Sequence, residues 1–248
     1  MRGFWPIFKR ELFAFFVTPL AYVLILAFVF WQGLHFYLLV RSFAQATEAS
    51  IDQGPVQAFF GGDVFYYLPL ILICPAITMR LFAEERRAGT IETLLTTPVG
   101  TAGVVLAKFC AAMVAYIAMW APTVLYIVVM RKAGDLDYRV VATSYLGVFG
   151  IGAQYIAIGT MMSAVARSQL VALILSTVLI LGFFLLGLGE FVLDEGATRE
   201  LCAYVSVWSQ MGELSKGIVD LRRLTLDATL VALPLYTTTR LVDAWRWG

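Results

Sequence analysis

The sequence predicts an all-α integral membrane protein in which six transmembrane helices follow an N-terminal amphipathic interfacial helix. Of the 248 residues, 60% are hydrophobic and only 14% are charged, too few polar residues to cover a water-soluble surface. Apolar runs of about 20 residues, the length that crosses a hydrocarbon core of about 30 Å, recur along the chain. Apolar residues at helical spacing precede the first run. We therefore treat residues 1–248 as a single transmembrane domain.

The segment 1–18 is expected to form a helix that lies in the membrane interface. Its apolar residues recur at helical spacing, and they are Phe4, Phe8, Leu12 and Phe15. Lys9, Arg10 and Glu11 occupy other faces, which is the pattern of an interfacial helix. The segment is either a plain anchor or a lever that links the spans to a cytosolic partner.

Six runs are predicted to span the membrane, namely 20–40, 63–81, 104–130, 140–165, 170–189 and 226–241. Pro69 and Pro75 are expected to kink the second run. The fourth and fifth runs are separated by only a few residues around Arg167, so they should form a tight antiparallel hairpin. Asp227 and Pro234 interrupt the sixth run, which is the weakest. An even number of spans places both termini on the same side.

The basic residues favour cytoplasmic termini. With this orientation the cytoplasmic segments carry slightly more lysine and arginine than the outer segments. Four of the outer bases lie in the long loop 190–225, where the positive-inside rule is less reliable. Most acidic residues fall on the outer side.

A polar stretch at 83–100 interrupts the apolar sequence and would face the cytoplasm. Gly89 can end a helix in the left-handed conformation, and Thr90 can cap a new one. Glu92 then falls in the first turn, where the helix dipole favours an acid, and Pro98 ends the helix.

This short helix would present one small apolar face. Ile91, Leu94 and Leu95 stand at positions i, i+3 and i+4. The face either rests on lipid headgroups or fills a groove on another protein.

The same stretch resembles the cytoplasmic signature of ABC-2 type permeases, which are membrane subunits of one class of ATP-binding-cassette transporters. Within that class it is most similar to the permeases of gliding-motility and nitrous-oxide-accessory type transporters. The resemblance is carried by Glu84, Glu85, Arg86, Arg87, Gly89, Thr90, Ile91, Glu92, Leu94, Leu95 and Pro98. It implies that 84–98 is a cytoplasmic coupling segment that docks on a nucleotide-binding subunit, with ion pairs of its charged residues holding the junction in the interface.

The resemblance also implies an exporter-like fold of type V and a set of partners. These are two copies of an ABC ATPase that binds ATP and Mg, a second permease chain in a homodimer or heterodimer, and membrane lipid. A periplasmic or membrane accessory subunit is a further partner of such complexes. Arg167 and Ser168 would supply a second cytoplasmic contact. The expected location is the bacterial inner membrane, with many passes and both termini in the cytoplasm.

A second resemblance lies in the outer loop before the last span. Residues 215–222 are similar to a segment of these permeases, although Arg223 stands where an acid would be expected. The site residues that it implies are Trp208, Lys216, Gly217, Asp220 and Arg222. The alternative is a short helix packed at the outer interface, because Trp208, Met211, Leu214 and Ile218 form an apolar stripe.

The residue content limits the other functions. The chain has no G-x-x-x-x-G-K-[ST] phosphate loop, so it is expected to be the non-catalytic subunit and to hold no cofactor of its own. Proton- or sodium-coupled carriers generally need charged groups or broken helices at mid-membrane, and the predicted spans are almost free of charge. Pro69 and Pro75 could break a helix, so a secondary transporter or channel stays the alternative. The single histidine, His35, argues against a zinc site or a serine-histidine enzyme. Nucleic acid is not expected as a partner, because the bases form no patch.

Overall fold

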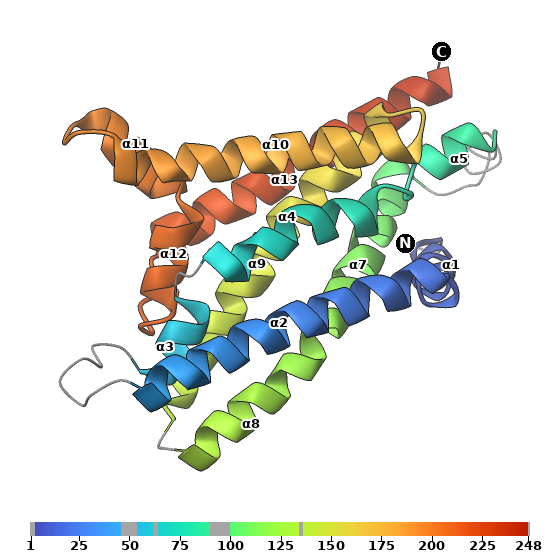
Figure 1. The fold of residues 1–248 in the computed structure, drawn as a ribbon. Coiled ribbons are helices and arrows are strands. Elements are labelled where there is room, and N and C mark those ends of the chain that lie inside the picture. The colour runs from blue at the N-terminus through green and yellow to red at the C-terminus, as the bar shows by residue number, and fades with distance from the viewer. Residues whose placement is uncertain (1–2, 46–53, 62–63, 90–99, 134–135, 248) are drawn as a thin grey trace.

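The computed structural model describes residues 3–45, 54–61, 64–89, 100–133 and 136–247. These residues form a bundle of helices joined by short turns, without a β-strand among them, so the all-α class is confirmed (Figure 1). The helices are α1 Phe4–Val17, α2 Pro19–Gln45, α3 Pro55–Phe60, α4 Val64–Thr78, α5 Ala83–Arg87, α7 Thr101–Trp120, the 3-10 helix η2 Ala121–Thr123, α8 Val124–Ala133, α9 Tyr138–Val165, α10 Gln169–Val192, α11 Ala197–Val205, α12 Val207–Leu214 and α13 Leu221–Trp247.

Within the described residues, four helices are long and apolar enough to cross a membrane. They are Pro19–Gln45, Thr101–Lys132, Tyr138–Val165 and Gln169–Val192. The chain is therefore a membrane protein, and its count of six spans stays a prediction. Helix α4 has 15 residues and two internal prolines, and it ends at Thr78, so the predicted run to 81 is too long at that end. Helix α13 is long enough but less apolar.

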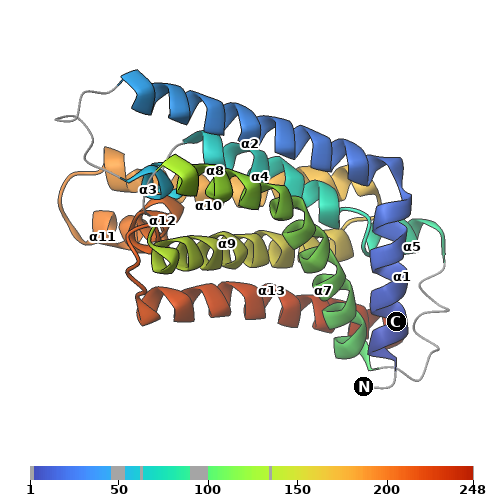
Figure 2. The same cartoon turned by 90° about the horizontal axis from the view of Figure 1, so that it is seen from below.

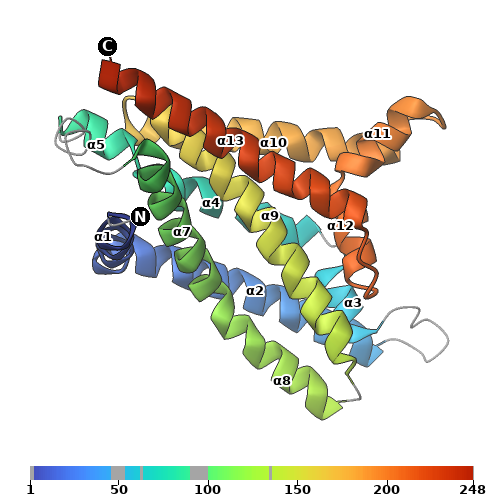
Figure 3. The same ribbon diagram turned by 180° about the vertical axis from the view of Figure 1, so that it is seen from behind.

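Helix α9 lies at the centre of the bundle and packs against α13, α10, α4, α12 and α7 (Figure 3). Two of its glycines allow neighbouring helices to come close. Gly152 lies against the ring of Tyr116, and Gly159 lies against the side chain of Thr78, so a Cβ at either position would overlap its neighbour. Glycine at these positions sets the distance between α9 and the helices α7 and α4.

The membrane-length helix Thr101–Lys132 is interrupted near its middle, where the sequence predicts a continuous span. Helix η2 separates α7 from α8, and Pro122 lies within it. Proline has no backbone N–H and cannot continue the α-helical hydrogen-bond pattern. The hydroxyl of Thr123 donates to the carbonyl of Trp120 at 2.6 Å.

The two ends of the bundle differ. Helices α1 and α5 lie at one end together with the C-terminal part of α13, and α3, α11 and α12 lie at the other (Figure 1). Helix α1 lies crosswise to α2 and packs on α7 (Figure 2). The first and last helices therefore bring their chain ends to the same end of the bundle.

Candidate functional site

An ionic cluster at the α1 and α5 end joins three segments that are distant in sequence. Lys108 of α7 is 1% exposed, and its ammonium lies 3.0 Å from Oε1 of Glu11 on α1 and 3.1 Å from Oε1 of Glu85 on α5. It also donates to the carbonyl of Leu81 at 2.6 Å. One buried cation therefore connects α1, α5 and the turn after α4 to α7.

Arg10 completes this cluster from the outside. Its guanidinium donates to Glu11 at 2.7 Å and to Glu85 at 2.6 Å. Each carboxylate thus pairs with one buried and one half-exposed cation. We call Arg10, Glu11, Glu85 and Lys108 the junction cluster.

The electrostatics of the junction cluster favour the ionised form of Glu11. Burial of Glu11 opposes ionisation, but the ammonium of Lys108 and the guanidinium of Arg10 outweigh it and lower the pKa of Glu11. Buried charges are tolerated only when they are paired and hydrogen-bonded. Removing one member would leave the others with an uncompensated charge.

The turn that precedes α5 is fixed on α9 by one serine. The hydroxyl oxygen of Ser163 accepts from the backbone N–H of Phe82 at 3.0 Å and of Ala83 at 3.3 Å. The same hydroxyl donates to the carbonyl of Met79 at 3.0 Å. The start of α5 therefore has a fixed position on the central helix.

Arg86 binds the end of α9, although the sequence predicts that it pairs with an acid. Its guanidinium donates to the carbonyls of Ala164 at 3.0 Å and Val165 at 3.1 Å. These carbonyls end a helix, where the helix dipole favours a cation. The guanidinium also lies 4.5 Å from the ring centre of Trp245 on α13. Burial, followed by the nearby charge of Arg167, lowers the pKa of Arg86.

Residues on both flanks of 90–99 contact α13. Arg86 contacts Trp245 before this segment, and the hydroxyl of Thr101 hydrogen-bonds the carboxylate of Asp243 after it. Gly89 has φ +69°, the left-handed conformation that the sequence predicts at the end of α5. The remaining residues of the predicted coupling segment, Thr90, Ile91, Glu92, Leu94, Leu95 and Pro98, lie outside the described residues.

The family model of the ABC-2 family transporter protein matches residues 5–206, which contain the whole junction cluster. The chain belongs to the ABC-2 family of transporter proteins. It is therefore a membrane permease of an ABC transporter, and permeases of this family generally work with a separate ABC ATPase subunit. Comparison with curated proteins yields no match.

In this ABC-2 permease, α1 uses its predicted apolar face for contact with protein. Phe15 is buried, and Phe4, Phe8 and Leu12 are half-buried. A second set of apolar side chains is exposed, including Trp5, Phe13 and Val17. Lys9 is exposed and lies 5.2 Å from the ring centre of Trp5. The sequence did not indicate that Glu11 faces inward, because its partner Lys108 is 97 positions away.

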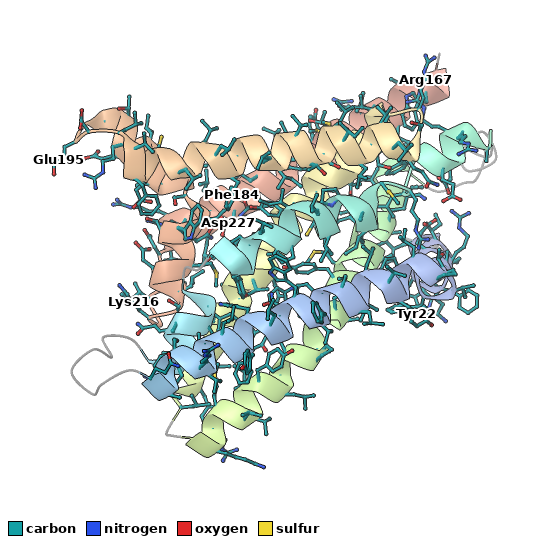
Figure 4. All side chains as sticks on the ribbon, viewed as in Figure 1. Tyr22, Arg167, Phe184, Glu195, Lys216 and Asp227 are labelled. Atoms are coloured by element: carbon teal, nitrogen blue, oxygen red, sulfur yellow. The ribbon has the colours of Figure 1, made fainter. Side chains whose placement is uncertain are left out.

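The other predicted cytoplasmic residues of the permease lie near the same end. Glu84 and Arg87 are exposed. Of the two neighbouring acids Glu84 and Glu85, it is Glu85 that belongs to the junction cluster. Ser168 caps α10 by accepting from the N–H of Val171 at 3.3 Å. Arg167 is exposed at this end, and Lys216 lies at the opposite end (Figure 4).

The residues of the predicted outer loop do not join the junction cluster. Trp208 packs against Phe184 and Tyr67, with ring centres 4.7 and 5.7 Å away. The predicted stripe ends at Leu214, because the helix ends there and Ile218 is 55% exposed. Lys216 and Arg222 are exposed, Gly217 has φ +80°, and Asp220 accepts from the N–H of Arg222 at 2.9 Å. Arg223 pairs with Glu213 at 3.2 Å.

The burial of two charged residues of the permease, Lys108 and Asp227, was not predicted from the sequence. Lys108 is the fifth residue of the predicted span 104–130, which was expected to be apolar. A lysine at this position was the feature of the sequence that could have indicated a buried ion pair. Asp227 of α13 is also buried, and it accepts from the amide of Gln154 at 2.7 Å and from that of Gln210. The interior is therefore more polar than predicted, and each of these charges has partners.

Proposed function

We propose that this ABC-2 permease couples ATP hydrolysis by a separate ATPase to export or to conformational work across the membrane. The observation that supports this proposal most directly is the buried Lys108, which binds carboxylates of α1 and α5 beside the predicted coupling segment. A segment that must transmit movement needs stiff attachment to the spans, and paired buried charges supply it.

The attachments define how movement would spread. A displacement of 84–98 by the ATPase would act on α5, and Ser163 and Arg86 would pass it to α9. Thr101 would pass it to α7 and, through Asp243, to α13. The crosswise helix α1 would brace the same partner through the junction cluster.

The assembly proposed for this permease contains two copies of an ATPase, which bind ATP and Mg. It also contains a second permease chain, which forms either a homodimer or a heterodimer with this one. The gliding-motility or nitrous-oxide-accessory subtype follows from the resemblance of residues 84–98, and an extracytoplasmic accessory subunit would fit it. We place the complex in the bacterial inner membrane with both termini in the cytoplasm. The position of α1 and of the end of α13 at the α5 end supports this orientation.

Docking can be tested with the double variant Ile91→Asp and Leu94→Asp. Two carboxylates on the apolar face should abolish copurification with the ATPase, because burying an unpaired charge in an interface is unfavourable, while membrane insertion is retained. The matched control is Leu201→Asp with Leu221→Asp, which changes two exposed leucines at the opposite end. Unchanged copurification of the first variant would contradict the proposal.

A further inference from the structure

A buried group of polar side chains lies beneath α2, far from the junction cluster. Gln32, Tyr66 and Trp120 are 0%, 0% and 1% exposed. Both side-chain polar atoms of Gln32 and the hydroxyl of Tyr66 have no hydrogen-bond partner among the residues that the structure describes, and the indole nitrogen of Trp120 has at most the hydroxyl of Tyr116. An unpaired buried polar group costs about 1–3 kcal/mol, so several in one place require an explanation.

Ring contacts place these groups together. Phe28, Gln32 and His35 stand at positions i, i+4 and i+7 of α2 and share its buried face. The ring centre of Phe28 lies 4.8 Å from that of Trp120, and that of His35 lies 6.3 Å from that of Tyr66. Tyr66 and Trp120 are themselves 5.3 Å apart. Gln32 is fully buried and stands on this face between Phe28, which contacts Trp120, and His35, which contacts Tyr66.

The helices that carry Tyr66 and Trp120 are both interrupted close to them. Pro69 follows Tyr66 by three positions within α4. The 3-10 helix η2, with Pro122, begins directly after Trp120. Apolar helices interrupted by proline are the features that mark binding sites in membrane transporters, because the interruption makes room for a ligand and is costly elsewhere.

The chemistry of the group selects its ligand. The amide of Gln32, the indole of Trp120 and the hydroxyl of Tyr66 together offer more donors than acceptors, so they favour a ligand with acceptor oxygens. Among the described residues, the buried charged side chains are Lys108 and Asp227, and neither belongs to this group. The ligand is therefore neutral, because nothing here would balance a charge.

Access to the group is from the bilayer. Helix α2 buries only Ala21, Phe28, Gln32 and His35, and most of its other apolar side chains point outward. A single helix thus separates the group from lipid.

We propose that Gln32, Tyr66 and Trp120 form a binding site for the carbonyl oxygen of a neutral, membrane-soluble molecule such as a ketone or an ester. This goes beyond the coupling function, since it names what the bundle binds. Binding at this site can be measured without the ATPase. The binding-site proposal can therefore fail while the coupling proposal stands, and the coupling proposal can fail while the binding-site proposal stands.

The test uses the full chain in dodecyl maltoside, a detergent without carbonyl groups. The probe is a propionyl-(dimethylamino)naphthalene ketone, whose emission moves to longer wavelength when its carbonyl accepts hydrogen bonds, and the comparison compound is the propyl hydrocarbon analogue. Wild-type protein should bind the ketone about tenfold more tightly than the propyl analogue. The emission of the bound ketone should lie at longer wavelength than its emission in detergent micelles without protein. Gln32→Leu should weaken ketone binding by about three- to tenfold and leave hydrocarbon binding unchanged.

Two neighbouring tyrosines supply a matched pair in case Gln32→Leu does not fold. Tyr66→Phe removes a hydroxyl without a partner, whereas Tyr67→Phe removes one that donates to the carbonyl of Phe60 at 3.5 Å. Both residues are fully buried. Only Tyr66→Phe should weaken ketone binding, by about threefold or more. Equal binding of ketone and hydrocarbon to the wild type, or equal effects of the two tyrosine variants, would overturn the proposal.

Discussion

Lys108 shows how one side chain can organise the α1 and α5 end of this permease. A lysine is almost never fully buried unless it is paired, and here its three donors are directed to two carboxylates and one carbonyl. The pairs hold helices α1 and α5 against α7. The role of the residue comes from its partners, which lie on other helices.

Replacing Lys108 by Met should destabilise the permease by about 2–4 kcal/mol, because Glu11 and Glu85 would lose their buried cation. Thermal unfolding in detergent measures this. Lys132→Met is the control, because Lys132 is exposed on α8 and should change little. Adding Glu85→Gln to Lys108→Met should recover part of the loss, and equal unfolding temperatures of wild type and Lys108→Met would refute the role of the pair.

The lowered pKa of Glu11 predicts a pH dependence of stability. Because the pKa is lower in the folded protein than its ordinary value of 4.5, the stabilisation is complete above about pH 4.5 and declines as the pH falls through the folded-state pKa. Glu11→Gln lacks this contribution. The unfolding temperatures of wild type and Glu11→Gln should differ at pH 7 and converge below about pH 4.5. A difference that is constant across this range would show that Glu11 acts by packing alone.

At the scale of elements, α5 is short and depends on its neighbours for its position. A helix of 5 residues has little stability of its own. Ser163 fixes its start on α9, and Arg86 fixes its body on the end of α9. The connection between α5 and the central helix α9 is therefore made by hydrogen bonds to backbone atoms.

Ser163→Ala should uncouple these elements more than it unfolds them. It removes three hydrogen bonds and leaves two N–H groups unsatisfied, a loss of about 1–3 kcal/mol. ATPase turnover of the assembled complex should change while copurification is retained. Ser176→Ala is the control, because Ser176 is equally buried and its hydroxyl donates only within α10, to Ala172 at 2.6 Å and Leu173 at 3.1 Å. The same turnover in both variants would contradict the assignment.

The sequence predicts most helices of the bundle, because apolar runs of membrane length leave few other structures. It did not predict the interruption at Ala121–Thr123, since a proline in a long apolar run is compatible with a kink as well as with a break. In the candidate site, Gly89 could be predicted from local conformation alone. The inward direction of Glu11 and the carbonyl partners of Arg86 could not, because both depend on the packing of helices distant in the chain.

At the scale of the whole molecule, α9 is the central helix of the bundle, and most of the other long helices pack against it. Its glycines decide how closely they approach, and Gly159 against Thr78 joins α9 to α4 just before the turn that Ser163 holds. The position of the junction cluster thus depends on packing inside the bundle.

Gly159→Ala should destabilise the fold by about 1–3 kcal/mol, because the added methyl group overlaps Thr78 and must push α4 away. Thermal unfolding measures the effect. Gly182→Ala is the matched control, because a Cβ there meets nothing within 4 Å on α10, and alanine favours helix over glycine. If both variants unfold at the same temperature, close packing at Gly159 is not important for stability.

The shared location of α1 and the end of α13 matters for the design of purification handles. A fluorescent protein or affinity tag fused to either terminus would sit at the α5 end of the bundle and obstruct the surface where the ATPase is proposed to dock. If a pull-down with such a fusion failed, the cause would be steric obstruction by the tag and not the absence of an interaction with the ATPase. An epitope inserted after Lys216, at the opposite end of the molecule, would leave that surface free (Figure 4).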